Sequence, residues 1–162
     1  GKVVLYKSRI VVRGDQAVEG VDYVETFSPV AKLETIRLAL ALIIILKMKP
    51  LQMDVNTAYL HSDLEEDIYM WGFPGYPLNP GYCWKLLKSL YGLPQAGRNW
   101  NKMFVDFLLT LEFIQIREDL CLFILVRGRE IVAIFALYVD DFIVGTTSDD
   151  IEIWLVSEFR NI

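Results

Sequence analysis

The chain has 162 residues, of which 54% are hydrophobic and 13% are aromatic, and its net charge is −5. This length allows one domain with at most two lobes, and this apolar content excludes a disordered chain. The acidic net charge, taken alone, argues against binding to nucleic acid.

The first third of the chain is expected to contain an extended segment, an irregular stretch and a helix. Residues 3–13 are rich in Val and Ile and predict an extended segment, and residues 14–34 lack a regular period. A helix is predicted over residues 35–49, with Thr35 as its cap. Its apolar run, residues 38–46, is about half as long as a membrane span, so we expect a buried helix and no span.

The middle of the chain is punctuated by proline and glycine. Residues 51–55 predict a short strand that ends on an acid, and residues 58–67 predict a short helix. Residues 71–81 hold three prolines and three glycines and predict a loop. Residues 83–90 are read as a strand or as the entry to the next element. Apolar side chains at helical spacing then predict a helix from Gln95 or Ala96 to about Leu111.

The last third changes to a strand pattern. Residues 122–126, 131–138 and 142–145 are rich in Ile, Val and Phe and predict strands, with Gly128 in a turn between the first two. Because these strands follow helices in mixed order, the pattern favours an α+β fold over a doubly wound one.

The two cysteines and the single histidine do not form a metal site. Cys83 and Cys121 are not in a CxxC pair, and His61 cannot complete a zinc ligand set. We expect both cysteines to be buried and reduced, as in an intracellular protein.

Two segments are basic although the chain is acidic. Four cations and no acid lie in residues 1–13, and the same holds for residues 83–105; the cations are Lys2, Lys7, Arg9, Arg13, Lys85, Lys88, Arg98 and Lys102. The segments fit local contacts to phosphate, and the alternative is an ordinary solvated surface.

Two adjacent carboxylates, Asp140 and Asp141, interrupt an otherwise apolar predicted hairpin. A solvated turn is the alternative explanation, but the Asn-Gly or Asp-Gly pair that favours such turns is absent. Adjacent acids repel each other unless a cation neutralises them, and oxygen ligands suit magnesium. Asp54, at the end of another short strand, would converge on the pair if the strands are neighbours. Three carboxylates clamping two magnesium ions would support phosphoryl transfer.

Five motifs in chain order resemble the reverse transcriptase of copia-type LTR retrotransposons, and the likeness covers essentially the whole chain. They occupy residues 6–14, 20–31, 52–61, 89–93 and 138–141, the last reading Tyr-Val-Asp-Asp. The resemblance implies an α+β fold comprising the fingers and palm of a right-hand polymerase, with an antiparallel palm sheet packed on helices and the thumb missing. Residues 1–162 would form this fragment, with residues 1–50 and 60–95 mostly fingers and residues 51–59 and 96–162 mostly palm.

The resemblance also implies roles for individual residues. Asp54, Asp140 and Asp141 match the catalytic acids, and two Mg²⁺ ions, or Mn²⁺ in their place, would be held by Asp54, Asp140 and the carbonyl of Val55.

Four further residues are expected to bind the incoming nucleotide. Lys7 and Arg9 would meet the triphosphate, with Arg13 as an alternative. Tyr59 would exclude a ribose 2′-hydroxyl, or else serve core packing. Gln95 would lie against the nucleotide, or else be a helix-capping or surface amide.

The implied activity is RNA-directed DNA polymerisation, with nucleotidyl transfer from a dNTP to a primer 3′-hydroxyl. The implied partners are an RNA or DNA template with its primer and the rest of a Pol polyprotein, namely thumb, ribonuclease H and integrase, without a membrane. The implied location is intracellular, in a cytoplasmic virus-like particle, with an organelle or the nucleus as alternatives.

Departures from the family pattern leave two other functions open. Pro94 and Gly97 stand where the family has Lys and Pro, and Leu120 stands where it has Pro. These fit a non-catalytic remnant of a decayed retroelement. A two-metal nuclease could use the same acids, although such enzymes carry additional acids or histidines.

Overall fold

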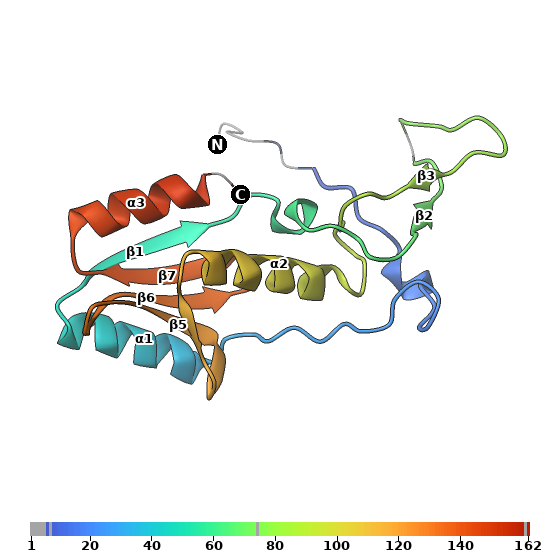
Figure 1. The fold of residues 1–162 in the computed structure, drawn as a ribbon. Coiled ribbons are helices and arrows are strands. Elements are labelled where there is room, and N and C mark those ends of the chain that lie inside the picture. The colour runs from blue at the N-terminus through green and yellow to red at the C-terminus, as the bar shows by residue number, and fades with distance from the viewer. Residues whose placement is uncertain (1–5, 7, 74, 161) are drawn as a thin grey trace, which may run out of the picture. The chain divides into compact units, whose positions relative to one another are not determined.

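The structure is a computed structural model and describes residues 6, 8–73, 75–160 and 162 (Figure 1). The chain divides into two compact units. One unit comprises residues 1–27 and 59–100, and the other comprises residues 28–58 and 101–162. Lys7, which was expected to bind phosphate, lies outside the described residues.

The second unit is built on a five-stranded sheet with the order β1-β7-β6-β5-β4. All neighbouring strands are antiparallel. The strands are β1 (Lys49–Asp54), β4 (Ile114–Ile116), β5 (Asp119–Arg127), β6 (Glu130–Tyr138) and β7 (Asp141–Thr146). The predicted α+β class and the three predicted C-terminal strands are therefore confirmed, whereas β4 was not predicted.

Helix α1 (Leu33–Ile45) packs on one face of this sheet through a cluster that includes Ala39, Ile43 and Ile134. The helix ends four residues before the predicted Lys49, because Lys49 and Pro50 belong to β1. Strand β1 lies at the edge of the sheet, where a proline without an N–H is tolerated.

The prediction that residues 38–46 form a buried helix was wrong for one side of α1. Thr35, Ala39 and Ile43 are buried at four-residue spacing, as expected for one face of a helix. On the other side Ile44 and Ile45 are 74% and 70% exposed. A single layer of sheet can cover only one face of a helix that is apolar all round.

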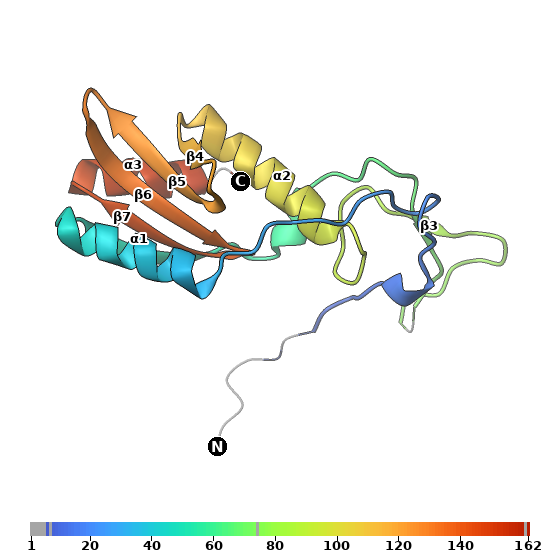
Figure 2. The ribbon, with the colours of Figure 1, turned by 90° about the horizontal axis from the view of Figure 1, so that it is seen from below.

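The opposite face of the sheet carries an aromatic cluster. Phe104 of α2 (Ala96–Thr110) contacts Phe135 and Phe142 of the sheet and Phe159 of α3, with ring centroids 5.5–6.0 Å apart. Helix α3 (Asp149–Phe159) was not predicted; Figures 1 and 2 show it on the side of the sheet away from α1. The predicted helix from residue 95 or 96 is confirmed as α2.

The first unit is held by a small apolar cluster and has little regular structure. Ile68, Leu93 and Ala96 form the buried part of the cluster. Its regular elements are η1 (Gly14–Gln16), η2 (Ala58–His61, which begins at the last residue of the other unit), and a hairpin of β2 (Tyr69–Met70) and β3 (Trp84–Lys85). The helix predicted over residues 58–67 is thus only the four residues of η2. Residues 71–73 and 75–81 lie in a loop, as predicted.

The described part of residues 3–13 forms no strand. Instead, the Val12 N–H donates to the carbonyl of Tyr91 at 2.8 Å. Gly92 has a φ of 95°, and a Cβ there would lie 2.1 Å from the Val12 carbonyl oxygen. Only glycine fits this close approach of two backbones.

Cys121 is buried, but Cys83 is exposed, so the expectation of two buried thiols was wrong for Cys83. None of residues 71–73 and 75–81 in the preceding loop is buried, so this loop offers Cys83 no core to cover it. None of the described helices combines the length and the apolar content that crossing a membrane requires.

Candidate active site

A two-residue turn, Val139-Asp140, joins β6 to β7. Val139 has a φ of 57°, in the left-handed region that β-branched residues rarely adopt. Such strain, of roughly 1–3 kcal/mol, persists only where the surrounding structure enforces it, and it is concentrated at functional sites. The turn therefore has an unfavourable residue at a position where Asn or Gly would be relaxed.

Pairing between β1 and β7 brings the third acid to this turn. Asp54 lies opposite Asp141, and the Val55 N–H donates to the Asp140 carbonyl at 3.0 Å. In an antiparallel ladder, the pair next to a hydrogen-bonded pair is the close type, with Cα atoms about 4.5 Å apart. Asp54 and Asp141 are thus neighbours across the ladder, and Asp140 is tied to the residue after Asp54.

Like charges directly opposite each other destabilise a sheet. Asp54 and Asp141 are exposed, and Asp140 is half-buried. Nothing in the fold requires these acids at this edge, since polar uncharged residues would complete the same ladder. The arrangement is the one expected where a bound cation offsets the repulsion.

Strand pairing also assigns two of the three acids, Asp54 and Asp141, to one face of the sheet. Tyr138 pairs with Asp141, and Asp141 with Asp54, so the three form a row across the sheet. Residues two positions along, Ala136 and Ile143, face α1, so by the alternation of strands the row lies on the α1 face. A pocket of about 180 Å³ lies there, lined by Ile36, Gln52, Ala136, Tyr138, Asp141, Phe142 and Ile143.

The oxygen donors at this edge suit a hard cation such as Mg²⁺. Among the described residues, however, no three His, Cys, Asp or Glu side chains are gathered closely enough to hold a metal ion. The backbone thus places the acids side by side, and side-chain rotation would have to bring the carboxylates together. The donor set fits the predicted ions in kind and in backbone position.

In the first unit, two of the expected nucleotide-binding residues, Arg9 and Tyr59, both contact the ring of Tyr91. The Arg9 guanidinium lies over the Tyr91 ring, 5.4 Å from its centroid, and the Tyr91 ring lies 4.7 Å from that of Tyr59. Tyr59 also packs against the Ile68 cluster and is half-buried. Core packing thus describes part of Tyr59, while its exposed part remains accessible.

Gln95 is only 1% exposed, so the alternative of a surface amide was wrong. Its Nε2 donates to the Asp22 carbonyl at 2.9 Å and to Glu66 Oε2 at 3.3 Å, while its Oε1 is buried without a hydrogen-bond partner. Its main-chain carbonyl accepts from the Asn99 N–H, at the start of α2.

Several cations of the two basic segments are paired with acids at the surface. Arg13 pairs with Asp15, Lys85 with Asp67, Lys88 with Asp63 and Arg98 with Glu25, at 2.6–2.8 Å. The hydrogen bond and charge of Asp15 raise the pKa of Arg13, and those of Arg13 lower the pKa of Asp15. Exposed pairs of this kind are weak, and phosphate could displace them.

Sequence reasoning missed two residues that the structure places in these sites. Val139 carries the backbone strain of the turn, and Tyr91 links Arg9 to Tyr59. A β-branched residue in a two-residue turn could have been noticed from sequence, since such turns favour Asn and Gly. The contacts of Tyr91 carry no sequence signal, because they join segments more than 30 residues apart.

Known proteins match this chain over most of its length. The family model described as reverse transcriptase (RNA-dependent DNA polymerase) matches residues 1–160. The chain is 41% identical over 146 residues to the retrovirus-related Pol polyprotein from transposon RE1 of Arabidopsis thaliana, covering 89% of the chain and 10% of that protein. It is 40% identical over 145 residues to the corresponding polyprotein from transposon TNT 1-94 of Nicotiana tabacum, covering 88% of the chain and 11% of that protein.

A more distant relative is the transposon Ty1-H Gag-Pol polyprotein of Saccharomyces cerevisiae, 28% identical over 144 residues, covering 85% of the chain and 7% of that protein. The chain spans about a tenth of the length of the curated relatives it matches. No solved structure matches the chain. The chain belongs to the reverse transcriptase family, in the branch of copia-type Pol polyproteins.

Proposed function

We propose that this chain carries the fingers and part of the palm of an RNA-directed DNA polymerase, with Asp54, Asp140 and Asp141 as its catalytic acids. The observation that supports this most directly is the pairing of Asp54 with Asp141 beside the Val55–Asp140 hydrogen bond. The sheet unit would be palm, and the unit with residues 59–100 would be fingers.

Two divalent ions would be held by Asp54, Asp140 and the Val55 carbonyl, and when bound they supply charge stabilisation for transfer of a nucleotide to a primer 3′-hydroxyl. Asp141 would orient its neighbours, because it lies between Asp54 and Tyr138 in one row of the sheet. The strained turn at Val139 would hold Asp140 at the end of the hairpin.

The remaining residues would bind the dNTP. Lys7 and Arg9 would contact the triphosphate, and the exposed part of Tyr59 would exclude a 2′-hydroxyl. For Gln95 to lie against the nucleotide, its buried Oε1 would have to become exposed when the nucleotide binds. A template with its primer and the rest of a Pol polyprotein would be the partners, within an intracellular virus-like particle.

Metal binding tests the acids without requiring activity. Water-proton relaxation with Mn²⁺ should detect binding to the wild-type chain, and Asp54→Asn and Asp140→Asn should each weaken it at least about tenfold, because each removes a charged ligand. Asp150→Asn, an exposed acid in the first turn of α3, is the matched control and should bind as wild type. Equal Mn²⁺ binding by all four proteins would refute the assignment.

Primer extension on an RNA template with Mg²⁺ and dNTPs, by the chain joined to the downstream polymerase region that the family resemblance implies, then tests the reaction. We expect Asp140→Asn to extend a primer at least about 100-fold more slowly than wild type, and Asp150→Asn to match wild type. Metal binding without extension would favour the non-catalytic remnant, and degradation of the template would favour the nuclease.

A further inference from the structure

The loop between β2 and β3 displays aromatic side chains to solvent. Trp71, Tyr76 and Tyr82 are 77%, 65% and 66% exposed, and Tyr69 and Trp84 at the base of the loop are exposed as well. Large aromatic side chains grouped at a surface commonly mark an interaction site, since exposure of so much apolar area is unfavourable in water.

The described part of this loop is ordered by its own contacts. The short β2–β3 ladder is extended by a hydrogen bond from the Leu86 N–H to the Ile68 carbonyl at 2.9 Å, which fixes the base. Near the tip, the Tyr76 N–H donates to the Phe73 carbonyl at 2.9 Å, and the two rings lie 5.3 Å apart. A Cβ on Gly72 would lie 3.0 Å from backbone atoms of Tyr76 and Leu78, so the two limbs touch there.

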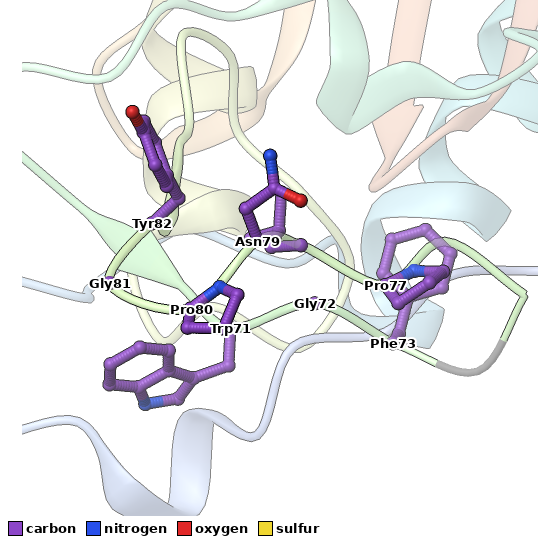
Figure 3. Close-up of a pocket in the computed structure, with 9 residues that line it drawn as sticks. Trp71, Gly72, Phe73, Pro77, Asn79, Pro80, Gly81 and Tyr82 are labelled. Carbon is purple, nitrogen blue, oxygen red and sulfur yellow. The ribbon is translucent and has the colours of Figure 1, made fainter.

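The two limbs line an open hollow of about 450 Å³ (Figure 3). Trp71 and Phe73 line it from the limb after β2, and Pro77, Pro80 and Tyr82 line it from the limb before β3. The fixed φ of Pro77 and Pro80 lowers the entropy that the loop would lose on binding.

The loop itself carries no negative charge that would repel a polyanion. Residues 68–105 contain no Asp or Glu, while Lys85 and Lys88 follow directly on the second limb. Both lysines pair with acids at the surface, Asp67 and Asp63, and such pairs are weak and screened by salt. Electrostatics therefore permits a nucleic acid here, and the aromatic rings would supply most of its affinity.

We propose that residues 71–73 and 75–83 form a stacking platform for unpaired bases of single-stranded nucleic acid, with Trp71 and Tyr82 as its main contacts. Every base offers a flat π-face, so a platform of this kind is tolerant of sequence. The choice of nucleic acid over other flat ligands rests on the proposed function. The platform itself requires no catalysis, no metal and none of the three acids.

Fluorescence anisotropy of the whole chain with a labelled 20-nucleotide single-stranded RNA, in EDTA and low salt, tests the platform. Trp71→Ala and Tyr82→Ala should each weaken binding roughly tenfold, and Trp71→Phe should restore most of it because a ring is retained. Leu87→Ala is the matched control: Leu87 is 75% exposed in the same unit but has no π-face, so its loss should leave binding unchanged. An abasic oligonucleotide of equal length should bind at least about tenfold more weakly than the RNA.

Several results would overturn the proposal. These are no binding by the wild-type chain, equal binding of the abasic strand, or equal weakening by Leu87→Ala. The proposal would also be overturned if Trp71→Ala bound RNA as tightly as wild type while circular dichroism showed both proteins to be equally folded. Sedimentation would show whether the chain self-associates. If Trp71→Ala abolished self-association but did not change RNA binding, the loop would be an interface with a second copy of the chain instead. The binding assay contains EDTA and therefore no metal. Its outcome does not depend on whether the chain can extend a primer.

Discussion

At the residue scale, the two cysteines show how burial changes the reactivity of identical side chains. Cys121 is buried in β5, and Cys83 is exposed beside the aromatic loop. Burial, and next to it the negative charge of Asp119, raises the pKa of the Cys121 thiol to about 11. Because the thiolate is the reactive form, the two cysteines should differ in reactivity.

Iodoacetamide at pH 8 should therefore label Cys83 in the folded protein and leave Cys121 unlabelled until denaturant is added, as read by peptide mass spectrometry. The folded state holds the Cys121 proton more tightly than the unfolded state does. This contribution to stability is complete below pH 9, the ordinary pKa of the thiol, and is lost as pH rises to about 11. Cys121→Ala should lose that part of the pH dependence; rapid labelling of Cys121 at pH 8 would contradict the assignment.

At the element scale, two glycines that look alike in sequence have different surroundings. Gly97 is the second residue of α2, and a Cβ there would meet nothing within 4 Å. Gly145 lies in β7 under α1, and a Cβ there would lie 2.4 Å from Ile43 Cγ1 and 3.2 Å from Met48 Sδ. The first glycine weakens its helix, whereas the second allows helix and sheet to pack closely.

The same substitution at these positions should thus have opposite effects. Gly97→Ala should raise the free energy of unfolding by about 0.5–1 kcal/mol, because alanine restricts the unfolded chain and favours the helix. Gly145→Ala should lower it by about 1–3 kcal/mol, because Ile43 and α1 must shift. Urea denaturation of the two variants and of wild type measures both free energies. If both substitutions changed the free energy of unfolding in the same direction, the packing described around Gly97 or Gly145 would be wrong.

At the scale of the whole molecule, apolar packing and surface charge have separate roles. The ion pairs of the described residues, such as Lys49–Asp149 and Arg127–Glu112, join largely exposed side chains. Pairs of this kind contribute little and are screened by salt. Rings such as Phe104, which is fully buried among Phe135, Phe142 and Phe159, should carry much more of the stability.

Raising NaCl from roughly 0.05 to 0.5 M should accordingly shift Tm by less than about 4 °C. Phe104→Ala should lower Tm by about 10 °C, because it removes a ring from a close-packed cluster. Differential scanning calorimetry compares the two. A salt effect as large as that of Phe104→Ala would mean that surface charge dominates the stability.

Much of this protein can be predicted from local patterns. Strands β5, β6 and β7 and helix α2 follow from apolar runs and helical spacing, because each can be recognised within about 15 residues. Helix α3 was missed although Ser148, whose side chain accepts from the Ile151 N–H, and the acids after it form a local start signal for a helix. The early end of α1 could not be predicted this way. The stop of α1 depends on β7 recruiting Lys49 and Pro50 into the sheet, and that is a long-range pairing.

The candidate site divides in the same way. Sequence alone identifies Asp54, Asp140 and Asp141, because carboxylates at the ends of apolar strands are conspicuous and the family motifs accompany them. Only the tertiary structure decides that Asp54 lies opposite Asp141, that Val139 is strained and that Tyr91 joins Arg9 to Tyr59. The physical reason is that strand register and ring contacts depend on residues far apart in the chain, whose pairing is selected by packing of the whole core.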